Sequence, residues 1–157
     1  MSNDKTNAMR ILDRSGVEYT VFSYPCKEAI DGVTVAEKLS APVDEVFKTL
    51  VTEGKSRNFY VFVVPAAKEL DLKKAAACVG EKSVEMIAVK DINKVTGYIR
   101  GGCSPVGMKK QYTTVFDSSA KEKEKIFVSA GKIGCQFRVS PEDLRKVTGG
   151  KFESVTR

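Results

Sequence analysis

The stretch GYIRGGCSPVGMKK, residues 97–110, gathers glycines, a cysteine and basic side chains that could carry chemistry. Its glycines match neither the GxxxxGK[ST] pattern of a nucleotide P-loop nor the GxGxxG pattern of dinucleotide-binding proteins. The adjacent Gly101 and Gly102 would let backbone amides approach an anion or a carbonyl oxygen closely. A tight connector between two elements would use the same residues, so the pattern alone leaves both interpretations open.

The chain contains no histidine, which excludes a Ser-His-Asp triad, a Cys-His dyad and a histidine general base. Cys103 could act as a nucleophile only if Arg100, Lys109 or Lys110 lowered its pKa, and without a histidine partner the sequence disfavours that role. No two of the four cysteines form a CxxC pair, so neither a zinc site nor any other metal site is expected. Chemistry must therefore use lysine, carboxylates, tyrosine, hydroxyls, backbone amides or the substrate itself.

Lys48 lies in VDEVFKTLVT, among apolar residues at the start of an expected strand. Such a lysine can extend its ammonium from a strand edge into water. It can equally face a pocket, where its charge would bind an anion or polarise a carbonyl. The stretch VSAGK, residues 128–132, is either a plain hairpin turn or a second wall of the pocket that Gly101 would line.

The composition indicates one globular domain over residues 1–157, with 42% apolar and 29% charged residues. The net charge of +6 suits a polyanionic partner such as tRNA, and it also suits solubility alone. No apolar run approaches the roughly 20 residues that span a membrane. The polar first residues lack the apolar core of a signal peptide, so we expect a cytoplasmic protein with reduced cysteines and no membrane contact.

Periodicity and turn residues predict several short strands and short helices without a regular βαβ alternation, which favours an α+β fold with a mostly antiparallel or mixed sheet. We expect Asn7 or Asp4 to cap the first helix and Ser140 to cap the last. Helices are expected over 3–17, 34–41, 68–80, 90–97 and 140–150, and strands over 18–24, the later part of 42–52, 59–64, 83–89, 112–119, 125–131, 135–140 and 151–155.

Five segments together resemble the YbaK/EbsC family of aminoacyl-tRNA deacylases. They are VFKTLV (46–51), ELDLKKAA (69–76), KSVEMI (82–87), TGYIRGGCSPVGMKK (96–110) and VSAGKIG (128–134). The resemblance covers roughly residues 5–155. It implies the fold of the YbaK/prolyl-tRNA-synthetase-associated domain, an α+β fold with a mixed, barrel-like β-sheet flanked by short helices.

The resemblance also implies an activity, which is trans-editing of cysteine wrongly attached to tRNA(Pro), and of Cys-tRNA(Cys) as well. Cysteine and proline are close in size, and small steric differences discriminate by only about 10–200-fold, so a second site must remove the error. The implied partners are the acceptor end of mischarged tRNA and prolyl-tRNA synthetase. No cofactor is implied.

Matching positions carry over the residues of the implied site. The resemblance places Lys48, Gly101 and Gly102 in catalysis, and it places the substrate-binding positions at Tyr24, Thr49, Ser104, Pro105 and Ser129. An aspartate of some members corresponds to Gln136 here, which removes any acidic role at that position.

In this family the substrate's own cysteine thiol is thought to attack its ester carbonyl, giving a thiolactone and free tRNA. Lys48 would either favour the thiolate or bind the ribose-phosphate of the terminal adenosine, and Cys103 becomes a bystander. Two alternatives stay open: editing of alanine or serine by water attack, and a non-catalytic module that docks on tRNA or a synthetase.

Overall fold

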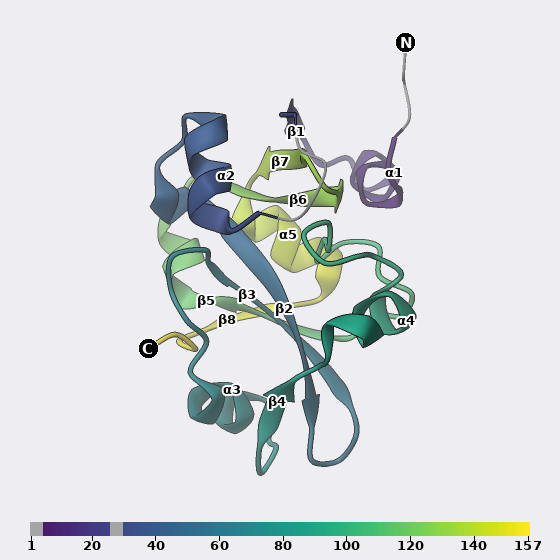
Figure 1. Cartoon of the computed structure of the whole chain (residues 1–157), viewed down its shortest axis with the longest axis vertical. Coiled ribbons are helices and arrows are strands. Elements are labelled where there is room, and N and C mark those ends of the chain that lie inside the picture. Colours follow the sequence, from purple (N-terminus) through teal and green to yellow (C-terminus); the bar gives the residue numbers. More distant parts are fainter. Residues whose placement is uncertain (1–4, 26–29) are drawn as a thin grey trace.

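The computed structural model describes residues 5–25 and 30–157, which form two β-sheets flanked by short helices (Figure 1). The α-helices are α1 (Asn7–Arg14), α2 (Gly32–Leu39), α3 (Leu72–Val79), α4 (Ile92–Thr96) and α5 (Pro141–Thr148), and the 3-10 turns are η1 (Val43–Glu45), η2 (Val89–Asp91) and η3 (Ser118–Glu122). The strands are β1 (Tyr19–Ser23), β2 (Phe47–Gly54), β3 (Phe59–Pro65), β4 (Val84–Met86), β5 (Thr113–Asp117), β6 (Ile126–Lys132), β7 (Cys135–Val139) and β8 (Lys151–Glu153). Cys26 lies outside the described residues.

The sheets confirm the expected α+β class with mixed pairing. One sheet has the order β1-β7-β6, and both of its strand pairs are antiparallel. The other has the order β4-β2-β3-β5-β8, in which the β2–β3 hairpin is antiparallel while β3–β5 and β5–β8 are parallel. Three-residue β4 and β8 at its two edges leave little open backbone.

The two sheets enclose one apolar interior, which gives the fold its barrel-like character. Val46, just before β2, forms a parallel bridge with Phe127 of β6 and so joins the sheets at one corner. Alternating side chains of both sheets then point inward into one cluster. Its fully buried members include Val61, Val63, Ile126, Val128, Phe116 and Phe137.

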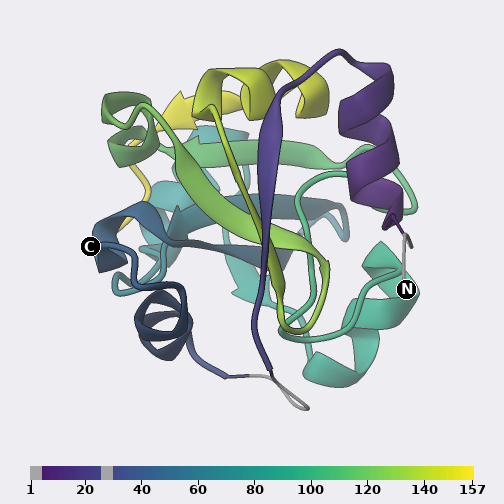
Figure 2. The same ribbon diagram turned by 90° about the horizontal axis from the view of Figure 1, so that it is seen from above.

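Helices cover the outer faces of the sheets. On the outer face of the larger sheet, Phe62 and Val64 pack against Ala75 and Ala76 of α3. At the joined corner, α2 packs on Val46 and Phe127 (Figure 2). Its first residue is Gly32 because a Cβ there would lie 2.1 Å from the Cβ of Ala66, so only glycine permits this approach.

Helix ends follow the expected chemistry with one correction. Ser140 caps α5, as expected, by accepting a hydrogen bond from the Asp143 amide. The expected cap of α1 at Asn7 is wrong, because Thr6 Oγ1 accepts from the Met9 amide at 3.2 Å. Asn7 instead donates from Nδ2 to the carbonyl of Gly107, a contact 100 residues away that the local sequence does not signal. Asp4 lies outside the described residues.

Within the described part of the chain, no helix is long and apolar enough to cross a membrane.

Candidate active site

The candidate site begins where β2 and β6 leave their bridge at Val46 and Phe127. Two residues further along each strand stand Lys48 and Ser129, on the side of the strands that carries the bridged pair. The pairing of Lys48 with Val64, an outer-face residue under α3, confirms that Lys48 belongs to the outer face. Strand register therefore brings the lysine and the serine to the same corner of the molecule.

The smaller sheet adds two polar side chains to this corner. Gln136 of β7 is the cross-strand partner of both Ser129 and Phe22, so all three share the outer face. Its Nε2 donates to the hydroxyl of Tyr24 at 3.4 Å, and the Tyr24 amide donates to the Gly134 carbonyl at 3.0 Å. Because Gln136 is neutral and largely buried, this wall of the site is polar without being acidic.

The glycine-rich loop closes the far end of the β6–β7 hairpin. A Cβ on Gly102 would lie 3.0 Å from backbone atoms of Lys132 and Ile133, so the loop rests directly on the hairpin turn. Gly101 has a φ of +84°, a conformation that favours glycine. Figure 2 shows this turn between α2 on one side and the segment from α4 onward on the other.

The backbone amides of Gly101 and Gly102 differ in their hydrogen bonds. The Gly102 amide donates to the carbonyl of Ile99 at 2.9 Å, so the expectation that it holds a substrate oxygen conflicts with this conformation. The Gly101 amide has no acceptor among the residues that the structure describes. Gly101 thus has the amide that could bind a carbonyl oxygen, and Gly102 supplies the close packing that positions it.

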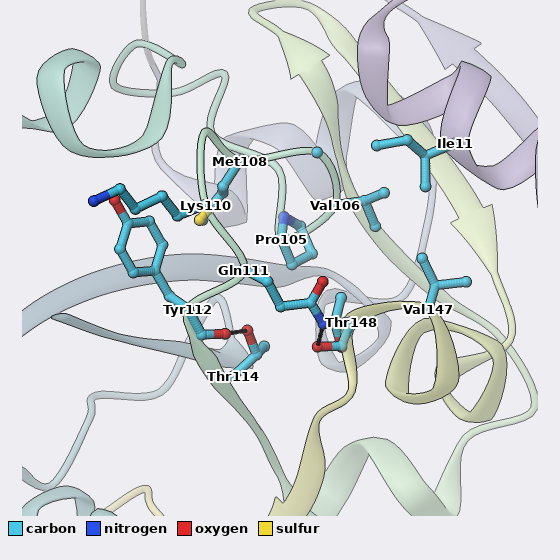
Figure 3. Close-up of a pocket in the computed structure, with 11 residues that line it drawn as sticks. Ile11, Pro105, Val106, Met108, Lys110, Gln111, Tyr112, Thr114, Val147 and Thr148 are labelled. Atoms are coloured by element: carbon cyan, nitrogen blue, oxygen red, sulfur yellow. Dashed lines mark hydrogen bonds between the residues drawn. The ribbon is translucent and has the colours of Figure 1, made fainter.

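Ser104 and Pro105 are buried parts of the loop's frame. Ser104 is fully buried, and its Oγ accepts from the Val106 amide at 3.2 Å. Pro105 lines a separate pocket of about 120 Å³ between α1, α5 and residues 105–114 (Figure 3). The structure therefore does not bring these two side chains to Lys48, and it gives them a role in holding the loop.

Tyr98 is a contributor to the loop that the sequence analysis missed. Its hydroxyl donates to the Val106 carbonyl at 2.5 Å, and its ring would lie 3.0 Å from a Cβ placed on Gly131. The side chain thus ties the start of the loop to its end and to the hairpin. The sequence signal was a large aromatic residue inside a run of glycines. The structure shows that this tyrosine is buried, whereas most loop residues are exposed.

Thr49 follows Lys48 but faces the other side of β2, toward the interior. Its Oγ1 is buried and has no hydrogen-bond partner within residues 5–25 and 30–157. Burying an unsatisfied hydroxyl costs about 1–3 kcal/mol. The structure places Thr49 on the opposite face of β2 from Lys48.

Lys48 is a half-buried cation without a close counter-ion. Burial lowers its pKa, and the charge of Glu69 partly opposes that effect. No ion pair or hydrogen bond of the Lys48 ammonium occurs among the described residues. Glu69 itself is exposed and pairs with Arg157 at 3.5 Å. The Lys48 charge is therefore available to an incoming anion or polarised oxygen.

Cys103 is unsuited to nucleophilic attack. Burial raises the pKa of its thiol to about 11, despite an opposing hydrogen bond with Thr96. The thiolate is the reactive form, so at neutral pH almost all Cys103 is unreactive. This agrees with the interpretation of Cys103 as a bystander.

Comparisons with known proteins point to one family of editing domains. The family model of the aminoacyl-tRNA editing domain matches residues 27–147. EbsC of Enterococcus faecalis, named as a candidate Cys-tRNA(Pro)/Cys-tRNA(Cys) deacylase, is 44% identical over 156 residues, which cover 99% of this chain and 95% of EbsC. A proline–tRNA ligase of Thermosipho africanus is 34% identical over 76 residues, which cover 48% of this chain and 13% of the ligase.

Solved structures show the same fold. A candidate trans-editing enzyme for prolyl-tRNA synthetase superposes with a TM-score of 0.87 at 23% identity, covering all of this chain and 99% of that one. The hypothetical protein APE2540 superposes with a TM-score of 0.88 at 20% identity, covering 97% and 100%.

The family model and the shared fold place this chain among aminoacyl-tRNA editing domains. The chain belongs to the aminoacyl-tRNA editing domain family, as the family match and the 44% identity to EbsC show.

Proposed function

We propose that this protein removes cysteine from mischarged tRNA(Pro), with the substrate's own thiol as the nucleophile. The observation that carries the proposal is the set of residues at the site. A half-buried Lys48, without an ion pair among the described residues, lies beside Ser129, and position 136 is a glutamine. The chain contains no histidine. Such a site can bind, orient and stabilise charge through a cation, hydroxyl groups and backbone amides. The identity to EbsC supports the same substrate.

The proposed reaction balances without any group from the enzyme. The substrate sulfur attacks the ester carbonyl carbon, the bond from that carbon to the ribose oxygen breaks, and the thiol proton ends on the released ribose hydroxyl. Because the nucleophile is tethered to the electrophile, holding both in a reactive geometry supplies much of the acceleration. The products are a cysteine thiolactone and free tRNA.

Each residue of the corner then has a defined task. Lys48 stabilises the thiolate or the negative charge that develops on the carbonyl oxygen, and the Gly101 amide donates to that oxygen. Ser129, Tyr24 and Gln136 orient the cysteinyl group. Thr49, on the interior face of β2, supports the strand that carries Lys48. Ser104 and Pro105 keep the loop in place.

A panel of charged tRNAs tests the proposal. Purified protein is mixed with Cys-, Ala-, Ser- and Pro-tRNA(Pro), and the loss of aminoacyl ester is followed over time. We expect Cys-tRNA(Pro) to be cleared fastest and Pro-tRNA(Pro) to be spared. Faster clearance of Ala- or Ser-tRNA(Pro) would instead indicate editing by water, and tight tRNA binding without turnover would indicate a binding module.

We further propose that prolyl-tRNA synthetase supplies the tRNA identity for this reaction. The partial match to a proline–tRNA ligase supports a link between this domain and that enzyme. Adding the synthetase should increase the preference for Cys-tRNA(Pro) over Cys-tRNA(Cys). An unchanged preference would show that the two proteins act independently.

A further inference from the structure

The positive charge of the chain is concentrated around the glycine loop. Residues 89–110 hold five cations and one carboxylate, a net charge of +4, against +6 for the whole chain. The rest of the chain, with 21 cations and 19 carboxylates, contributes only +2. No carboxylate occurs between Asp91 and Asp117. This uneven distribution points to a polyanion more directly than the net charge does.

The five cations of this segment are all exposed, and we call them together the α4 surface. It consists of the exposed side chains of Lys90, Lys94, Arg100, Lys109 and Lys110. The Lys109 ammonium donates to the Lys94 carbonyl at 3.2 Å, which fixes the later part of the loop on α4. Tyr112 donates to the Val95 carbonyl at 2.6 Å, and Figure 3 shows Lys110 extending beside the Tyr112 ring, away from the pocket.

Three of these five side chains make no polar contact with other described residues. Lys90, Arg100 and Lys110 form no side-chain ion pair or hydrogen bond in the part of the chain that the structure describes. Asp91, the single carboxylate of the segment, is 3.5 Å from the Lys94 ammonium. Two exposed apolar side chains, Val89 at 55% and Ile99 at 53%, stand next to Lys90 and Arg100.

The α4 surface adjoins the glycine loop of the candidate active site. Arg100 directly precedes Gly101, and Gly102 rests on Lys132, whose side chain is exposed. A chain of phosphates that crosses the surface would therefore end at the loop, where the aminoacyl ester must lie. Exposed lysine and arginine side chains without carboxylate partners bind phosphodiesters by releasing counterions.

We propose that the α4 surface binds the phosphodiester backbone of the tRNA acceptor arm and guides its aminoacylated end to Lys48. This inference rests on the proposed function, because it places the substrate of that same site. It adds which face of the protein carries the tRNA.

The test compares two triple variants. Lys90→Gln/Arg100→Gln/Lys110→Gln removes three charges of the α4 surface that make no internal side-chain contact. The control Lys73→Gln/Lys82→Gln/Lys121→Gln removes three exposed lysines from α3, from the link between α3 and β4, and from η3. Both variants have the same net charge. Binding of uncharged tRNA(Pro) and deacylation of Cys-tRNA(Pro) are measured between 50 and 200 mM salt.

The α4 variant should bind tRNA more weakly, with a salt slope shallower by about 3, so that the ratio of wild-type to variant affinity falls about 40-fold across this salt range. The loss should appear in KM for tRNA, and the control should match the wild type. Equal behaviour of the two variants would overturn the inference, as would a defect confined to binding of prolyl-tRNA synthetase.

A short substrate separates this inference from the proposed function. Cysteinyl-adenosine lacks the acceptor-arm phosphates, so wild type and α4 variant should cleave it at similar rates. If the wild type cleaves neither substrate, the proposed function fails. If it cleaves both and the α4 variant shows no KM defect on tRNA, the function stands and the assignment of the surface is wrong.

Discussion

Lys48 is the residue on which the proposed chemistry depends. It is a half-buried cation whose pKa is lowered by burial, and it has no close counter-ion among the described residues. Leaving a charge in this state is unfavourable for folding. We expect this charge to serve catalysis, because a desolvated cation stabilises developing negative charge more strongly than one in water.

Replacing Lys48 should separate activity from stability. Lys48→Met keeps the aliphatic stem and removes the charge, so we expect deacylation of Cys-tRNA(Pro) to fall by about 10²–10³-fold. The free energy of unfolding should rise by about 0.5–1 kcal/mol, because a partly desolvated charge is gone. Single-turnover kinetics and urea unfolding check the two parts. Unchanged deacylation rates would rule out the role assigned to Lys48.

The pH dependence of the deacylation rate should show the ionisation of two groups. The rate should rise as the substrate thiol ionises near its usual pKa of about 8.5. It should fall again at higher pH, as Lys48 loses its proton below its ordinary pKa of 10.5. Lys48→Arg should keep partial activity and lose the alkaline decline, because arginine stays protonated. A decline that persists in Lys48→Arg would assign it to another group.

Cys103 should be dispensable for catalysis. Its thiol stays protonated up to a pKa of about 11, so it cannot compete with the substrate's thiol at neutral pH. Cys103→Ala should leave kcat within about twofold and cost about 1 kcal/mol of stability for the lost packing. The check is the rate on Cys-tRNA(Pro) alongside thermal unfolding. A loss comparable to that of Lys48→Met would restore Cys103 as a nucleophile.

The glycine loop acts as one element whose packing on the β6–β7 hairpin sets the position of the Gly101 amide. Tyr98 ties it internally, Asn7 donates to the Gly107 carbonyl, and Gly102 allows its close approach to Lys132. Substitutions that lift the loop by a few tenths of an ångström should therefore lower the deacylation rate.

Gly102→Ala tests this positioning. The new Cβ would lie 3.0 Å from backbone atoms that cannot swing away, so the loop must move. We expect a loss of about tenfold or more in kcat and about 1–3 kcal/mol in stability. Gly16→Ala is the control, because its φ of +70° makes alanine strained there while the space around it is open. It should cost about 1 kcal/mol of stability with kcat intact. Equal kcat in both variants would show that the loop position does not matter.

The sequence predicted the elements better than their partners. The β2–β3 hairpin and α5 with its Ser140 cap are local features, because turn residues and side-chain alternation specify them over a few positions. The bridge between Val46 and Phe127 joins positions that are 81 apart, and no local pattern encodes it. That bridge brings Lys48 and Ser129 together.

The candidate site was predicted in part, for the same reason. A single sequence does not distinguish a residue that faces the substrate from one that holds the loop in place. Ser104 and Pro105 were therefore grouped with Lys48 through the resemblance alone. Burial separates them, because Ser104 is fully buried and bonded to Val106. The free Oγ1 of Thr49 is likewise invisible without three-dimensional contacts.

Taken as a whole, the molecule places a compact site at the corner where its two sheets join. β2 and β6 border one shared interior, α2 lies on one side of the β6–β7 hairpin, and α4 lies on the other (Figures 1 and 2). This arrangement suits a substrate that is itself large and negatively charged but reacts only at its tip. In the proposed mechanism the reactive group arrives on the substrate, so the site needs no histidine.

The most direct test of that claim is the dependence of the rate on the substrate's thiol. Single-turnover deacylation is measured with Cys-tRNA(Pro), with Ser-tRNA(Pro), and with tRNA(Pro) carrying S-methylcysteine. Cys-tRNA(Pro) should react about 100-fold faster than either other substrate, because only the free thiol can attack its own ester. Comparable rates for the cysteinyl and S-methylcysteinyl esters would contradict the mechanism and point to attack by water.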